Sequence, residues 1–319
     1  MKEIVIGRNQ CDQRLDKFLA KYLKEAPKSF IYKMLRKKNI KLNGKRAQGS
    51  EKLSEGDRVI LYLSDETLEK FLGRQKTEQR VRGDVGKVHL DIVYENEHIA
   101  LINKPAGMLS QKAEAGDLSL VEYFAEYCGG AEEGFSPGIC NRLDRNTSGL
   151  VIAGKTLAGL QKMSELIRER RIEKYYMTIV KGKMETGASV EGYLKKDSRT
   201  NKVRILPEPA EGASYIKTEY EPLYTDGAYT LLRVRLHTGR PHQIRSHLSS
   251  LSHPVVGDVK YGGGVENGTI RRQLLHAYEL RFPKLEPPFD DLSEKSFKAE
   301  LPEDFYREEF SKKLLTNLK

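Results

Sequence analysis

The sequence is poor in cysteine and in long apolar runs. Its three cysteines, Cys11, Cys128 and Cys140, are widely spaced and form no CxxC pair. This spacing argues against a disulfide framework and a zinc ribbon, and it fits a reducing cytoplasm. Its apolar runs fall short of the roughly 20 residues that a membrane-spanning helix needs, and residues 1–8 lack the apolar stretch of a signal peptide. We therefore expect a cytoplasmic protein without a membrane partner.

Positive charge is in excess, and it is unevenly distributed. The 319 residues carry 55 Lys and Arg against 45 Asp and Glu, which gives a net charge of +10. Residues 1–64 hold 16 basic and 7 acidic side chains, whereas the remaining 255 residues hold 39 and 38. A basic surface points to a polyanionic partner. Since a domain takes roughly 150 residues, the chain has room for two, and we expect the smaller, basic one in residues 1–64.

Residues 1–64 have the pattern of a small α/β module. Apolar residues at helical spacing predict one helix after Asp12 as N-cap and a second around residues 30–37. A strand over 40–42 is followed by Asn43-Gly44, a hairpin-turn signal. Cations on the second helix and the hairpin would contact phosphates without reading the base sequence. The predicted RNA contacts are Lys33, Arg36, Lys37, Lys38, Lys41, Lys45 and Arg46.

The basic module resembles the alpha-L RNA-binding domain, which is found at the N-termini of many RNA-modifying enzymes. The motifs R-L-D-K-F-L at 14–19, I-K-L-N-G-K at 40–45 and G-D-R-V at 56–59 carry the resemblance, which covers about residues 12–63. It implies RNA binding, and an incidental basic module is the alternative. Residues 65–87 lose the apolar periodicity and are predicted to be a linker.

Residues 88–319 are predicted to form an α+β domain with a largely antiparallel sheet. An amphipathic helix is predicted over 157–167. Many strands with few intervening helices argue against a doubly wound parallel sheet. The predicted strands cover 90–94, 99–103, 175–180, 229–236 and 274–280.

Residues 149–156, G-L-V-I-A-G-K-T, match the phosphate-loop pattern GxxxxGK[ST]. That pattern needs a strand before its first glycine and a flexible loop between its two glycines. Here a turn-like N-T-S precedes the first glycine, and the apolar run 150–153 is typical of a buried strand. A nucleotide triphosphatase is therefore a disfavoured alternative.

Four histidines lie within seventeen residues but do not have the spacing of a metal site. No two of them are four residues apart, as on a helical zinc site, and no cysteine is near. Hydrogen bonds within a loop, or contacts with RNA, are the simpler interpretation, and we expect no metal. The four are His237, His242, His247 and His253.

Residues 141–149, N-R-L-D-R-N-T-S-G, place one carboxylate between two arginines. Because opposite charges lower a carboxyl pKa, we expect Asp144 to be ionised, as suits a nucleophile or a charge stabiliser. A surface salt bridge is the alternative. The stretch is similar to the catalytic loop of RluA-type pseudouridine synthases, H-R-L-D-x-x-T-S-G-L. Asn141 stands where histidine is common, and we expect it to tune the site rather than to abolish its activity.

Further motifs of the RluA family follow in the family's order. Several motifs in the right order are more specific than any one alone, and together they extend from about residue 90 to residue 283. The matching segments are 91–95, 102–108, 173–176 (K-x-Y), 236–248 (T-G-R-x-H-Q-I-R-x-H), 253–262 and 275–277.

The resemblance implies an isomerase that converts uridine in RNA to pseudouridine. The N1–C1′ bond breaks, the uracil turns over while held, and C5 bonds to C1′. No redox step or group donor is needed, so we expect no cofactor. The sequence leaves open whether the carboxylate attacks the ribose or the base, or stabilises a glycal-like species.

By the resemblance, the site residues divide into catalytic and substrate-binding groups. Asp144 is the catalytic carboxylate, and Arg245 pairs with it. Tyr176 stacks against the target base and is a candidate for proton transfer. Arg142 helps to extrude the uridine from its stack. The remaining substrate-binding residues are Arg240 and His242.

An alpha-L module on this type of domain favours large-subunit ribosomal RNA as the substrate, with transfer RNA as the runner-up. We expect a monomer. The main rival is a non-catalytic RNA-binding or ribosome-assembly protein that keeps the fold, and the intact set of Asp144, Tyr176 and Arg245 argues against it.

Overall fold

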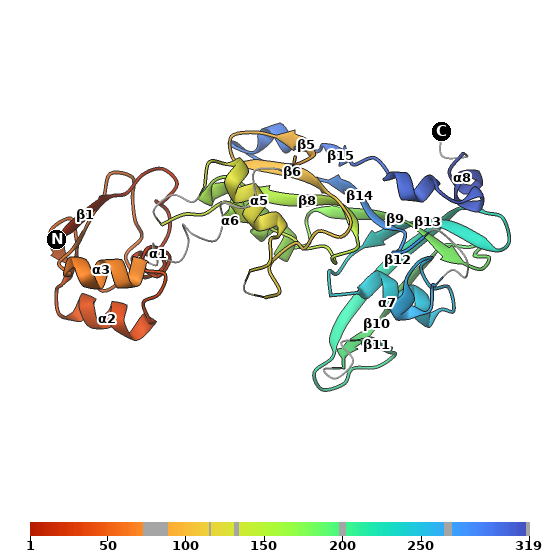
Figure 1. Ribbon diagram of the computed structural model, residues 1–319, viewed down its shortest axis with the longest axis horizontal. Coiled ribbons are helices and arrows are strands. Elements are labelled where there is room, and N and C mark those ends of the chain that lie inside the picture. The colour runs from red at the N-terminus through yellow and green to blue at the C-terminus, as the bar shows by residue number, and fades with distance from the viewer. Residues whose placement is uncertain (73–88, 115, 131–133, 198–201, 265–269, 317–319) are drawn as a thin grey trace.

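The computed structural model describes residues 1–72, 89–114, 116–130, 134–197, 202–264 and 270–316. Within these ranges the chain forms an N-terminal module and a larger domain, each built on its own sheet (Figure 1). This mixed arrangement confirms the predicted α+β class. None of the helices in these ranges is long and apolar enough to cross a membrane.

The N-terminal module packs its helices against a small antiparallel sheet. Its first elements are β1 (Lys2–Val5), α1 (Leu15–Tyr22), α2 (Lys28–Arg36), β2 (Ile40–Leu42), β3 (Lys45–Arg46) and β4 (Arg58–Leu61). The strand order is β1-β4-β2-β3. Asn43 and Gly44 join β2 to β3 with φ angles of 49° and 74°, the left-handed backbone that a tight hairpin turn requires. Phe18, Leu35 and Val59 are buried in the core of the module.

Two local predictions for this module are wrong. Asp12 is not the N-cap of α1: the helix begins after Arg14, and the Asp12 carboxylate instead lies 2.8 Å from the Lys52 ammonium. Asp65–Leu72, assigned to the linker, forms helix α3, and Leu68 is buried in the module's core. Leu68, Phe71 and Leu72 in fact have helical spacing. The rest of the predicted linker lies outside the described residues.

The larger domain is built on a broad, largely antiparallel sheet, as predicted. Its strands are β5 (Ile92–Glu95), β6 (Ile99–Lys104), β7 (Gly138–Ile139), β8 (Ser148–Gly154), β9 (Glu173–Lys181), β10 (Ala188–Lys196), β11 (Val203–Leu206), β12 (Ser214–Thr225), β13 (Tyr229–Leu236), β14 (Leu275–Arg281) and β15 (Ser296–Lys298). The main path is β11-β10-β12-β13-β9-β14-β8-β6-β5, with β7 on β8 and β15 on β14. Among these pairings, only β14 with β8 is parallel.

Strand β8 settles the interpretation of the phosphate-loop pattern. All seven of its residues are buried, and it lies between β6 and β14. The residues that would have to wrap a phosphate are therefore paired in the sheet, and the prediction of a buried strand is confirmed. Gly149 has a φ of 110°, and a side chain there would collide with the backbone of Ala277 on β14.

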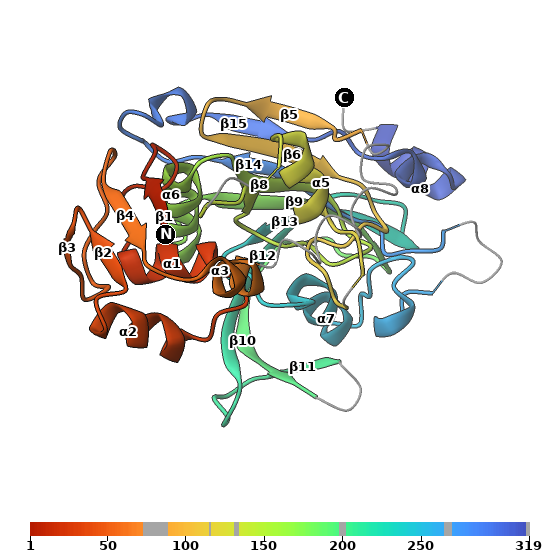
Figure 2. The ribbon, with the colours of Figure 1, turned by 60° about the vertical axis from the view of Figure 1, so that its left-hand side comes forward.

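The helices of the larger domain are α5 (Leu120–Tyr127), α6 (Leu157–Arg168), α7 (Gln243–Ser250) and α8 (Glu309–Thr316). Helix α6 follows β8 directly, and the Thr156 hydroxyl caps it by accepting a hydrogen bond from the Gly159 amide. Helix α7 lies against β11 and β12 (Figures 1 and 2). The main hydrophobic cluster fills the space between α7 and the central strands, so it fixes the position of α7 relative to these strands.

Candidate active site

One pocket of about 850 Å³ collects all six residues that the sequence predicted as catalytic or substrate-binding. They come from three separate parts of the chain: the loop before β8, strand β9, and the segment formed by the loop before α7 and the first turn of that helix. Strands β8 and β9 both flank β14, which brings the first two parts together. The six residues are Asp144, Tyr176, Arg245, Arg142, Arg240 and His242.

At the centre of the pocket a guanidinium joins two carboxylates. Arg245 donates from Nη1 to Oδ2 of Asp144 at 2.7 Å. On its other side it donates from Nε and Nη2 to Asp258, at 2.6 and 2.9 Å. Burial opposes the charge on Arg245, but the hydrogen bonds to Asp258 and Asp144 outweigh it and raise the pKa of Arg245. The bridging cation is therefore permanently charged.

The two carboxylates differ in exposure. The side chain of Asp258 is 1% exposed, whereas that of Asp144 is 24% exposed. Asp258 uses both its oxygens on Arg245, and Oδ1 also accepts from the backbone amides of Lys260 and Tyr261. Asp258 is thus an internal anchor, while Asp144 offers a carboxylate oxygen to the pocket.

The loop that carries Asp144 is held by the segment after β6. The Ser110 hydroxyl donates to the Leu143 carbonyl and accepts from the Leu143 amide, at 2.8 and 3.0 Å. Lys104 is fully buried, and its ammonium donates to the carbonyls of Pro105, Met108 and Arg145. Burial, with a smaller contribution from Arg272, lowers the pKa of Lys104 to about 7. The residues before and after Asp144 are therefore fixed.

The two arginines beside Asp144 in sequence form no ion pair with it among the described residues, so they are not the cations that hold it. Arg145 donates instead to the carbonyl of Gly107 at 3.0 Å. Arg142 is exposed on the pocket wall, with no ion pair to Asp144 in the part of the chain that the structure describes. The cation that holds Asp144 is Arg245, about a hundred residues further along the chain.

Asn141 has a structural contact that accounts for its place in the loop. Its side-chain oxygen accepts a hydrogen bond from the Ile152 amide at 2.7 Å. This contact attaches the start of the catalytic loop to β8.

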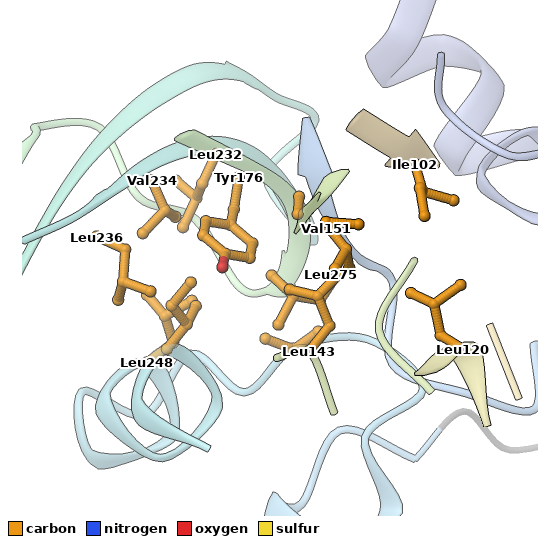
Figure 3. Packing of buried hydrophobic residues seen from close by; sticks show 14 of the residues in the cluster. Ile102, Leu120, Leu143, Val151, Tyr176, Leu232, Val234, Leu236, Leu248 and Leu275 are labelled. Atoms are coloured by element: carbon orange, nitrogen blue, oxygen red, sulfur yellow. The ribbon is translucent and has the colours of Figure 1, made fainter. Parts of the chain in front are cut away.

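Tyr176 reaches from β9 into the main hydrophobic cluster. Figure 3 shows its ring beside Leu248 on one side and Leu275 on the other, with its hydroxyl oxygen directed away from the strand. Burial, and to a lesser degree the charge of Asp144, raise the pKa of Tyr176. The phenol is therefore protonated at neutral pH, so its hydroxyl can donate a hydrogen bond but cannot act as a base.

His242 lies beside the Asp144 carboxylate. The Tyr261 hydroxyl accepts a hydrogen bond from the Val203 amide, and its own proton can be donated to Nδ1 of His242, 3.0 Å away. In that tautomer Nε2 carries the proton, 3.9 Å from Oδ2 of Asp144. Burial lowers the pKa of His242, although Asp144 acts in the opposite direction. A neutral imidazole at this position can donate one hydrogen bond into the pocket.

The other three of the four clustered histidines contact different groups of the protein. His237 contacts Glu219, His247 contacts Thr218, and His253 contacts the Lys181 carbonyl. Across the described ranges, no group of three or more His, Cys, Asp or Glu side chains is arranged to hold a metal ion.

The predicted RNA contacts gather on one part of the N-terminal module. Four lie on α2 or directly after its C-terminal end. Three lie on the β2–β3 hairpin, where Lys41 is directly opposite Arg46. All are exposed except Lys41, which is half-buried with its ammonium 5.1 Å from the centre of the Tyr62 ring. The four on or after the helix are Lys33, Arg36, Lys37 and Lys38, and the other two on the hairpin are Lys45 and Arg46.

The similarity to known proteins agrees with this geometry. The family described as RNA pseudouridylate synthase matches residues 98–250, and the S4 domain matches residues 13–59. The chain is 31% identical to ribosomal large subunit pseudouridine synthase C of Escherichia coli, over 91% of this chain and 94% of that protein. The chain belongs to the RNA pseudouridine synthases. It is accordingly an isomerase that acts on RNA, and the predicted family is confirmed.

Further relatives of this pseudouridine synthase give the same result. An uncharacterized RNA pseudouridine synthase of Mycoplasma genitalium is 30% identical over 89% of this chain and 90% of the relative. In fold, the chain is similar to human RNA pseudouridylate synthase domain containing 4, with a TM-score of 0.56, 22% identity, and coverage of 78% of this chain and 97% of that one.

Sequence reasoning missed two residues that organise the site, Asp258 and Lys104. Both lie inside segments that carried the family resemblance, at 253–262 and 102–108. A charged residue directly after an apolar strand or a tight turn is usually exposed, so composition gave no sign that either is buried. Their position inside the family motifs was the one feature of the sequence that pointed to a role in the site.

Proposed function

We propose that this enzyme isomerises specific uridines of large-subunit ribosomal RNA to pseudouridine. The observation that carries the proposal is the Asp144–Arg245–Asp258 arrangement, which presents one oriented carboxylate oxygen to the pocket. The printed name of the Escherichia coli relative supports ribosomal RNA as the substrate class. Transfer RNA is the second candidate.

In the proposed reaction, Asp144 is the catalytic carboxylate and Arg245 orients it. The N1–C1′ bond breaks, the C5–C1′ bond forms, the proton on C5 is lost and N1 gains a proton, so the atoms balance without a cofactor. Tyr176 stacks against the target uracil. Arg142 and Arg240 stabilise the extruded nucleotide, because a base inside a stack cannot reach the carboxylate.

The remaining substrate contact is His242, whose neutral Nε2–H is placed to donate to a uracil carbonyl beside Asp144. The N-terminal module, extended to residue 72 by helix α3, grips RNA phosphates through its exposed cations. We also propose that the enzyme works as a cytoplasmic monomer, where its three free cysteines stay reduced.

Mapping pseudouridines across total RNA, with and without the gene, tests the proposal directly. We expect one or more large-subunit ribosomal RNA positions to lose the modification, and to regain it from the wild-type gene but not from the Asp144→Asn variant. Loss confined to transfer RNA would overturn the ribosomal assignment.

A further inference from the structure

Outside the central arrangement, the pocket wall is strongly positive. Among its lining residues are eight Lys and Arg but one carboxylate, Asp144, which Arg245 already pairs. This is unexpected for a domain whose sequence is neutral overall, with 33 basic and 33 acidic side chains in residues 88–319. The fold has therefore collected cations from separate segments around one opening.

Three of these cations lie together where α6 ends and β9 begins. Arg168 is in the last turn of α6, Arg170 follows with a left-handed φ of 59°, and Lys174 is the second residue of β9. We call these three residues the α6 rim. Within the part of the chain that the structure describes, none of the three side chains has an ion pair or a hydrogen-bond partner.

The α6 rim adjoins the substrate pocket. Lys174 lies two residues before Tyr176, and a Cβ built on Gly239 would be 3.6 Å from its Nζ atom. The rim is thus next to the loop that carries Arg240. Burial, and to a lesser degree the nearby charge of Arg170, lowers the pKa of Lys174, so an anion bound at the rim would favour the charged form of Lys174.

We infer that the α6 rim binds phosphates of the RNA strand that flanks the target uridine, separately from the phosphate grip of the N-terminal module. This inference rests on the proposed function. The exposed guanidinium groups of Arg168 and Arg170 and the half-buried ammonium of Lys174 are unpaired within the described residues and line one pocket, which fits the repeated negative charges of an RNA backbone. Their place beside Tyr176 sets the strand next to the nucleotide that enters the pocket.

The test uses the full chain with the triple variant Arg168→Gln, Arg170→Gln, Lys174→Gln. A matched control removes the same charge at exposed lysines outside the pocket, with Lys295→Gln, Lys298→Gln and Lys312→Gln. Binding to large-subunit ribosomal RNA transcribed in vitro is measured against salt, and pseudouridine formation against RNA concentration. The charge-conserving variant Arg168→Lys, Arg170→Lys serves as a control for folding.

Each phosphate contact to a single strand contributes roughly 0.7 to the slope of log K against log salt. We expect the slope of the rim triple variant to be smaller by about 2. When salt is raised fourfold, the wild type should therefore lose about 16 times more affinity than the variant does. We also expect a raised KM with an unchanged kcat, and near wild-type behaviour from the lysine-substituted variant and the control.

An unchanged slope, or an equal loss in the control triple variant, would overturn the inference, as would a loss confined to kcat. The outcome is separable from that of the proposed function. If the wild-type chain bound the RNA but formed no pseudouridine, the proposed function would fail, while the comparison of slopes would still decide the role of the rim.

Discussion

The buried carboxylate of Asp258 offers the sharpest test of how the catalytic carboxylate is held. In an Asp258→Asn variant, the amide oxygen can replace Oδ1 and keep its contacts with Arg245 Nη2 and with the backbone amides of Lys260 and Tyr261. The amide nitrogen, in contrast, replaces Oδ2 and faces Nε of Arg245, donor against donor. The substitution therefore removes one charge and one hydrogen bond with little change in shape.

The size of the effect follows from burial. Removing one partner of a buried ion pair costs about 3–5 kcal/mol, and because Arg245 keeps its contact with Asp144, we expect a loss near 3 kcal/mol in the free energy of unfolding. Arg245 then shifts toward Asp144 and turns its carboxylate away from the pocket. Since a misplacement of about 1 Å can cost about 100-fold in rate, we expect kcat to fall by about that factor with little change in KM.

Two measurements check this prediction. Urea unfolding gives the change in stability, and release of tritium from uridine labelled at C5 gives kcat, because forming the C5–C1′ bond displaces that hydrogen. The matched control is Glu279→Gln, since Glu279 is a buried carboxylate that pairs with Arg233 and Arg281 and does not line the pocket. The control should lose stability and keep kcat. Wild-type kcat in Asp258→Asn, or an equal fall in both variants, would refute the reasoning.

Three further predictions concern chemistry, RNA binding and pH. Asp144→Asn should bind RNA normally and form no pseudouridine; turnover in a product assay would contradict the role of Asp144. Deleting residues 1–72 should weaken RNA binding and flatten its salt dependence, whereas unchanged affinity in a filter assay would refute the phosphate grip. Burial lowers the pKa of His276 to about 4, so the unfolded state binds more protons below pH 6.5. Stability should therefore fall by about 3 kcal/mol between pH 6.5 and 4, a loss that urea unfolding should not find in His276→Gln.

The neutral state expected of His276 has a clear structural cause. Its Nε2 atom lies 3.1 Å from the Ala299 carbonyl, which can only accept, so Nε2 donates. The Ser148 hydroxyl, 2.9 Å from Nδ1, then donates to that nitrogen. Both ring nitrogens are satisfied without a charge, and protonation would require the Ser148 hydroxyl to turn and accept from Nδ1–H instead.

Local patterns predicted the elements with the clearest periodicity, but not α5, α7, α8 or strands β10, β11 and β12. The helix around 30–37, the Asn43-Gly44 turn and the buried strand at 150–153 depend on periodicity and on backbone preferences of nearby residues, and all three are confirmed. Asp12 failed as an N-cap because the helix begins only after Arg14, and the exposed Asp12 carboxylate pairs with Lys52. Helix α3 was missed because a short amphipathic segment was hidden among charges, and its burial depends on the rest of the module.

By itself, the sequence determined the family, the order of the motifs and the concentration of charge in residues 1–64. Each of these depends only on which residues follow one another along the chain. Only the tertiary structure decided which cation holds Asp144. Two arginines flank it in sequence, yet the sheet order β13-β9-β14-β8 brings the segment after β13, which includes Arg245, to it from a hundred residues away. The structure also decided that Asp258 is buried behind Arg245, and that a nearly neutral domain has a positive pocket. Ion pairing depends on distance and burial in space, and neither can be read from neighbouring positions in a chain.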